Sequence, residues 1–114
     1  MILVIGGAGS GKLDYVKSLG YSDQDIANGV FDERKVVYNL QNIVFNDPDL
    51  TPEFLDALLT KEVVVCNEVG SGVIPLSARE RQARETTGRL CIRLAARAER
   101  VVRLVCGIPM LMKE

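Results

Sequence analysis

The chain has 114 residues, of which 47% are apolar and 25% are charged, and its formal net charge is −1. These values predict one soluble domain, residues 1–114, with a real hydrophobic core. They disfavour nonspecific nucleic-acid binding by the whole chain, and no stretch is long enough for a membrane span. The chain contains no histidine, which excludes histidine as a base, nucleophile or metal ligand.

The first elements are a predicted strand and helix joined by glycines. Residues 1–5 form a short apolar, β-branched run that is typical of a strand buried on both faces. Leu13, Val16 and Leu19 have helical spacing, and Gly20 is suited to end that helix. Between them lies a stretch from Gly6 to Lys12 with the G-x-x-x-x-G-K spacing of a phosphate-binding loop, or P-loop.

Each part of this loop has a physical reason to bind phosphate. Glycines let successive N–H groups point into one concavity, and the side chain of Lys12 adds a full positive charge. We therefore expect Lys12 to contact the β and γ phosphates of a nucleotide. The candidate cofactor-binding residues are Gly6, Gly7, Ala8, Gly9, Ser10, Gly11, Lys12 and Leu13. The alternative is a glycine-rich turn that binds nothing and leaves Lys12 solvated.

One position departs from the phosphate-loop pattern. The residue after the lysine is normally Ser or Thr, whose hydroxyl binds magnesium. Leu13 occupies this position and has no oxygen to offer. The pattern therefore predicts a phosphate site that lacks one ligand for the metal, so we name no metal-ligating residue.

The next segment, residues 20–62, alternates weak and clear signals. Ser22 is suited to cap one helical turn, and residues 36–38 predict a short strand followed by one or two helical turns over 39–45. A turn is expected at 46–49. Thr51 and Pro52 then open a clear helix, because Thr caps well and Pro fits the first helical position.

The remainder, from residue 62, continues the alternation of strands and helices. Strands are predicted over 62–66, 101–106 and 110–112, with a turn at 107–109, and Ser77 with Glu80 predicts a capping box for a long helix over 77–98. One side of that helix carries Ala83, Thr87, Leu90, Leu94 and Ala98. This order predicts an α/β fold of three layers around a mostly parallel central sheet.

A second glycine-containing loop, residues 67–75, follows the strand at 62–66. In parallel sheets ligands lie outside the carboxyl ends of the strands, so both glycine loops are expected on one edge. Glu68 is the acid at this edge. It could hold a metal through water or act as a general base, or equally cap the backbone of its own turn. Gly70 and Gly72 are expected to serve turn geometry.

Charge and cysteine placement give further expectations. Residues 20–62 hold nine acids and three bases, whereas residues 77–103 hold eight arginines and three glutamates. The arginines could face phosphates or a neighbouring subunit, although a solvated helix face is the simpler interpretation. Cys66, Cys91 and Cys106 form no C-x-x-C pair, and no signal peptide is evident, so buried free thiols in the cytoplasm are expected.

Several motifs together resemble a known family, the adenosylcobinamide kinase/adenosylcobinamide-phosphate guanylyltransferases of cobalamin biosynthesis. In chain order the matching segments are 1–7, 10–12, 67–75, 87–90, 93–96 and 107–109. The segment 67–75, Asn-Glu-Val-Gly-Ser-Gly-Val-Ile-Pro, is the most specific. The resemblance implies a P-loop α/β fold, a homo-oligomer, phosphorylation of cobinamide with ATP or GTP, and GMP transfer through a guanylylated histidine.

The departures from the family pattern fall at positions that the family uses for metal binding and catalysis. Members usually have Arg and Ser at the positions of Gly9 and Leu13, and an acid that helps to hold magnesium at the position of Tyr38. A polar Asn-Gln pair is replaced by Cys91 and Ile92, the segment with the guanylylated histidine is largely missing, and the chain is much shorter than its relatives. Arg89 matches a family arginine, for which ion pairing is expected.

The sequence therefore predicts a GTP- or ATP-binding P-loop protein that has lost guanylyl transfer. Three alternatives remain open for the function. In the first, the chain is a weakened kinase in which Lys12 and Glu68 carry the catalysis, and cobinamide is the acceptor. In the second, it is a non-catalytic paralogue that binds nucleotide or a partner in regulation or assembly. In the third, it is a purely structural oligomer whose glycine loop is empty.

Overall fold

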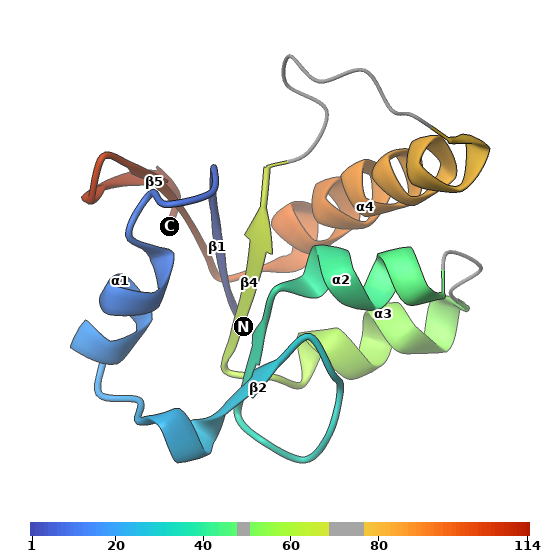
Figure 1. Ribbon diagram of the computed structural model, residues 1–114. Coiled ribbons are helices and arrows are strands. Elements are labelled where there is room, and N and C mark those ends of the chain that lie inside the picture. Colours follow the sequence, from blue (N-terminus) through green and yellow to red (C-terminus); the bar gives the residue numbers. More distant parts are fainter. Residues whose placement is uncertain (48–50, 69–76) are drawn as a thin grey trace.

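The computed structural model describes residues 1–47, 51–68 and 77–114 (Figure 1). In these ranges one sheet contains β1 (Ile2–Gly6), β2 (Ile26–Asn28), β3 (Val36–Tyr38), β4 (Val63–Asn67), β5 (Arg100–Val105) and β6 (Ile108–Lys113). The helices are α1 (Lys12–Ser18), α2 (Leu40–Asn46), α3 (Pro52–Leu59) and α4 (Ala78–Arg97), with a 3-10 turn, η1, at Asp23–Asp25.

The sheet has the order β2-β3-β4-β1-β5-β6, so β1 lies between β4 and β5. All neighbouring pairs are parallel except β5 with β6. The register at the carboxyl end places Gly6 beside Asn67 of β4 and beside Leu104 of β5. The glycine loop therefore starts from the middle of the sheet, between two supporting strands.

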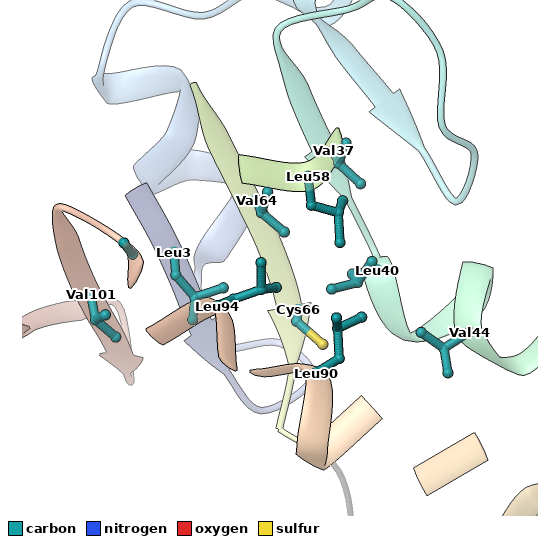
Figure 2. Close-up of a cluster of buried hydrophobic side chains, with 11 residues drawn as sticks. Leu3, Val37, Leu40, Val44, Leu58, Val64, Cys66, Leu90, Leu94 and Val101 are labelled. Atoms are coloured by element: carbon teal, nitrogen blue, oxygen red, sulfur yellow. The ribbon is translucent and has the colours of Figure 1, made fainter. Parts of the chain in front are cut away.

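Helices cover both faces of the sheet and make the predicted three layers (Figure 1). Buried side chains of the face against α2, α3 and α4 form the first core cluster (Figure 2): Leu3, Val37, Leu40, Val44, Leu58, Val64, Cys66, Leu90, Leu94, Ala98 and Val101. Those of the face against α1 form the second core cluster: Val4, Val16, Ile26, Val36, Val63, Val65, Val102 and Leu104. Successive residues of a strand alternate between the two clusters because strand side chains point to opposite faces.

The long helix α4 follows the sequence pattern closely. Ser77 Oγ accepts a hydrogen bond from the backbone N of Glu80 at 3.1 Å, which caps the helix start. The five residues predicted to line one side, Ala83, Thr87, Leu90, Leu94 and Ala98, are all buried. Arg89 lies on the exposed side and pairs with Glu85 one turn earlier, as expected for an ion pair within the chain.

Three expectations were wrong or incomplete. Strand β2 was not predicted, because only three residues pair with β3 and tertiary contact rather than a local pattern specifies it. The turn lies at Cys106 and Gly107, which have φ of 49° and 75°, so β6 already begins at Ile108. Cys106 is therefore an exposed thiol in a tight turn, and Cys91 is only partly buried, whereas Cys66 is buried as expected.

Candidate functional site: the glycine loop and its neighbours

The loop between β1 and α1 has a backbone that favours glycine at several points. Gly9 and Gly11 have φ of 71° and 93°, in the left-handed region where L side chains are strained. A Cβ atom on Gly6 would lie 2.5 Å from Ser10 Oγ and 2.9 Å from the backbone oxygen of Leu104. The glycines that match the motif at 6 and 11 are thus required by this local geometry.

Hydrogen bonds from the neighbouring strands fix both ends of the loop. The backbone N of Glu68, just after β4, donates to Gly6 O at 2.8 Å. The backbone N of Gly107, in the turn between β5 and β6, donates to Ser10 O at 2.9 Å. Within the loop, Ser10 N donates to Gly7 O at 3.2 Å. The loop is therefore held in one shape by residues from both sides of β1.

Lys12, the first residue of α1, points back into this loop. Its Nζ donates hydrogen bonds to Gly7 O at 2.6 Å and to Ser10 Oγ at 3.5 Å, and the residue is only 4% exposed. Burial lowers the pKa of Lys12 from its ordinary value of 10.5, while the charge of the nearby Glu68 carboxylate acts in the opposite direction. The Lys12 ammonium group therefore lies inside the loop. It donates hydrogen bonds to two protein oxygens that phosphate oxygens could replace.

Leu13 and Tyr38 both pack against the second core cluster and are partly buried. Leu13 contributes apolar contact there and has no side-chain oxygen. Tyr38 ends β3, which pairs with β4 and not with β1, so a whole strand separates it from the glycine loop. Neither residue therefore supplies a charged oxygen beside Lys12.

Glu68 lies close to the loop but is bound by an arginine. Its carboxylate accepts two hydrogen bonds from Arg103 of β5, from Nε to Oε1 at 2.5 Å and from Nη2 to Oε2 at 3.1 Å. This bidentate contact raises the pKa of Arg103. The sequence suggested that Glu68 either serves metal or base chemistry or caps its own turn. Each role needs the carboxylate oxygens that Arg103 already binds.

Arg103 was missed in the sequence, although a signal existed. It is the one charged residue inside the otherwise apolar run from Val101 to Val105. Val102 and Leu104 face the second core cluster, so Arg103 between them faces the other side of the sheet. An isolated arginine in a strand beside the loop-bearing strand is a candidate for contact with an anion.

Cys66 and Cys91 pack together in the first core cluster. Cys66 ends the buried part of β4, and its thiol donates a hydrogen bond to Asn67 O at 3.4 Å. The neighbouring thiol of Cys91 on α4, together with burial, raises the pKa of Cys66. Both thiols are free in the structure. Cys66 is therefore a neutral thiol that joins β4 to α4 beneath the site.

The residues present suit a nucleotide better than they suit a magnesium ion. The glycine loop offers backbone N–H groups and Lys12, which fits phosphate oxygens. Among the described residues no group of three Asp, Glu, His or Cys side chains is placed to hold a metal ion. Leu13 lacks the usual hydroxyl and Glu68 is held by Arg103, so neither of these two described residues offers a free oxygen to magnesium.

The fold and the glycine loop define a P-loop-type α/β protein, and comparison with protein families gives its family. Residues 26–112 match the family described as cobinamide kinase / cobinamide phosphate guanyltransferase. The chain belongs to this family and is, at that level, a nucleotide-binding protein related to cobalamin biosynthesis. The glycine loop precedes the matched residues, so its assignment depends on its own sequence and geometry. A search of the curated proteins gave no match.

Some sequence expectations concern residues that the structure does not describe. The glycines at 70 and 72 and most of the loop at 67–75 fall in the gap at 69–76, and the end of the turn at 46–49 falls in the gap at 48–50. Within the described ranges, no helix is both long and apolar enough to cross a membrane.

Proposed function

We propose that this chain binds the phosphates of GTP or ATP in the loop Gly6–Leu13, within a single domain formed by residues 1–114. The observation that carries this proposal is the inward-pointing Lys12, whose Nζ lies 2.6 Å from Gly7 O inside a loop of left-handed glycines. Backbone N–H groups and this ammonium form the arrangement that binds phosphate oxygens. Membership of the family supports a nucleotide as the source of the phosphates.

We further propose that guanylyl transfer has been lost. The family mechanism implied by the resemblance passes GMP through a histidine, and this chain has no histidine. Phosphoryl transfer relies mainly on positioning and on charge neutralisation by metal, lysine and N–H groups. Because the usual hydroxyl is replaced by Leu13, kinase activity with cobinamide as acceptor is weakened, with Lys12 contacting the β and γ phosphates and Glu68 acting as base.

A second candidate is a non-catalytic paralogue that binds nucleotide or a partner in regulation or assembly, as a cytoplasmic homo-oligomer. The contact that favours it is the bidentate Glu68–Arg103 pair, since both carboxylate oxygens of Glu68 already accept hydrogen bonds and are not free to contact a substrate hydroxyl. Turnover separates the two candidates. Cobinamide and ATP or GTP are incubated with the protein, and phosphorylated cobinamide supports the kinase, whereas nucleotide binding without product supports the paralogue.

The binding proposal itself is tested with Lys12→Ala. Nucleotide affinity, measured by calorimetry with GTP and ATP, should weaken by about tenfold or more, because charge-assisted hydrogen bonds to phosphate are lost. Lys17→Ala is the matched control, since Lys17 lies on the same helix but is exposed and pairs with Asp23. Equal affinities of Lys12→Ala and the wild type would overturn the proposal.

A further inference from the structure

Arg103 and Glu68 reach toward each other across the central strand. Glu68 follows β4, Arg103 belongs to β5, and β1 lies between these two strands. Arg103 is paired in register with Ile5, and the residue after Ile5 already begins the glycine loop. The ion pair therefore lies over the point where β1 enters the loop, on the face of the sheet opposite α1.

The pair is accessible to a ligand. The side chain of Arg103 is 43% exposed and that of Glu68 is 29% exposed, so neither partner is locked inside the core. A partly exposed ion pair is a weak contribution to folding, and it can be exchanged for another partner at little cost. The same Nε and Nη2 groups that bind Glu68 form the fork with which arginine binds two phosphate oxygens.

A nucleotide bound at the loop would need a second cation near its phosphates. Nucleotide phosphates carry several negative charges, whereas the described site provides Lys12 as a cation and places the Glu68 carboxylate nearby. The usual magnesium ligand is absent at Leu13, so little metal charge is available to offset this repulsion. A guanidinium that leaves Glu68 for the phosphates would supply the missing positive charge.

We propose that Arg103 is a second phosphate-binding cation, held by Glu68 in the free protein and transferred to the phosphate oxygens of a bound nucleoside triphosphate. This inference rests on nucleotide binding in the glycine loop. It assigns Glu68 a restraining role: the carboxylate orients Arg103 and opposes early anion binding. Arg103 then performs part of the charge neutralisation that a metal performs in an intact P-loop.

The test is a double-mutant cycle with Glu68→Gln, Arg103→Gln and the double variant, titrated with GTP, ATP and GMP in EDTA. Arg103→Gln should weaken triphosphate binding by about tenfold, because a bidentate charged contact is lost. Glu68→Gln should tighten it by about threefold or more, because the guanidinium is released. In the Arg103→Gln background that gain should vanish, and all effects should be smaller with GMP.

Other outcomes are equally informative. A Glu68→Gln gain that persists without Arg103 means that Glu68 merely repels phosphate, and it overturns the proposal, as does unchanged triphosphate binding by Arg103→Gln. Arg89→Gln is the control for losing one arginine, since Arg89 lies on the exposed side of α4, pairs with Glu85 there, and should leave affinity unchanged when replaced. Melting temperatures confirm folding. Should Arg103→Gln fail to fold, Arg103→Lys keeps the charge without the fork and should bind triphosphate more weakly than the wild type.

Failure of this inference is distinguishable from failure of the proposed function. When the wild type binds GTP or ATP and Lys12→Ala does not, the loop is a nucleotide site whatever the cycle shows. When the wild type binds neither nucleotide, the proposed function and this inference are both overturned.

Discussion

The backbone N of Gly107 donates a hydrogen bond to the backbone O of Ser10 at 2.9 Å, which joins the turn between β5 and β6 to the glycine loop. Gly11 lies against the same turn, because a Cβ atom on Gly11 would be 3.2 Å from the Cα of Gly107. The loop therefore depends on residues almost a full chain length away. A side chain at Gly11 therefore requires the backbone of Gly107 to shift by a few tenths of an ångström.

The first prediction is that Gly11→Ala destabilises the protein. Its φ of 93° is strained for an L residue, which costs roughly 1–2 kcal/mol, and the tight contact with Gly107 adds to this cost. Thermal unfolding followed by circular dichroism should show a lower melting temperature. Gly7→Ala is the matched comparison for stability, because a Cβ there meets no atom within 4 Å and its φ is not positive. Equal melting temperatures for the two variants would contradict this account.

A second prediction concerns alkaline pH and Lys12. Burial lowers the pKa of Lys12 below 10.5, so the folded free protein loses this proton at a lower pH than the unfolded chain does. Nucleotide affinity should fall as the pH rises through the lowered pKa, because the uncharged amine no longer attracts phosphate. Calorimetric titrations with GTP from neutral pH upward measure this loss, which should be absent from the residual binding of Lys12→Met.

The same pKa shift predicts the opposite trend for stability. Between the folded pKa of Lys12 and 10.5 the unfolded state binds more protons, so the free energy of unfolding should rise with pH across that window. Urea unfolding of the wild type minus that of Lys12→Met isolates this contribution. A difference that falls with pH over the same range would show that burial does not disfavour the ammonium.

The third prediction concerns guanylyl transfer. Incubation with radiolabelled GTP should leave no acid-labile GMP on the protein, because the chain contains no histidine to carry it. Label retained after acid treatment is quantified on a denaturing gel, with excess unlabelled GTP as the control for tight non-covalent binding. A covalent adduct on any residue would show that this chain transfers guanylyl groups by another nucleophile.

Much of the fold could be predicted from local patterns. The apolar run of β1, the Pro52 start of α3 and the apolar stripe of α4 are each specified by neighbouring residues, so their positions agreed with expectation. Strand β2 and the position of the last turn could not be predicted in this way. Strand β2 depends on pairing with β3. The last turn depends on a left-handed backbone at Cys106, which a non-glycine residue rarely adopts and the sequence therefore does not predict.

The candidate site shows the same division. The phosphate-loop spacing is a local motif, and the structure places Lys12 Nζ 2.6 Å from Gly7 O. The phosphate-binding role of Lys12 stays a prediction. The contact between Glu68 and Arg103 joins residues 35 positions apart across β1, and only the strand order brings them together. From the sequence alone, the expected partners of Glu68 are its own turn or a metal ion. A cation from β5 cannot be predicted, because the sequence does not show that β4 and β5 both neighbour β1.

The last prediction concerns magnesium. In an intact P-loop a hydroxyl and a nearby acid hold the metal against the β and γ phosphates. Here Leu13 packs in the second core cluster, Tyr38 lies one strand away, and Glu68 is bound to Arg103. Magnesium keeps several waters and needs only one or two protein oxygens, so Glu68 could compensate in part once released. We expect GTP and ATP affinity to change by less than about threefold on adding magnesium, since the bridging metal gains few protein ligands.

Leu13→Ser tests whether the missing hydroxyl causes the weak magnesium dependence, because it restores the hydroxyl without altering the glycines. It should increase the magnesium dependence of nucleotide affinity, while loss of the partly buried leucine lowers stability by about 1 kcal/mol. Leu13→Ala is the matched control, since it loses similar apolar contact and gains no oxygen, and its magnesium dependence should equal that of the wild type. Strong magnesium-dependent binding and turnover in the wild type would instead mean that Glu68 or another oxygen holds the metal. The weakened-chemistry interpretation would then be wrong and the kinase interpretation correct.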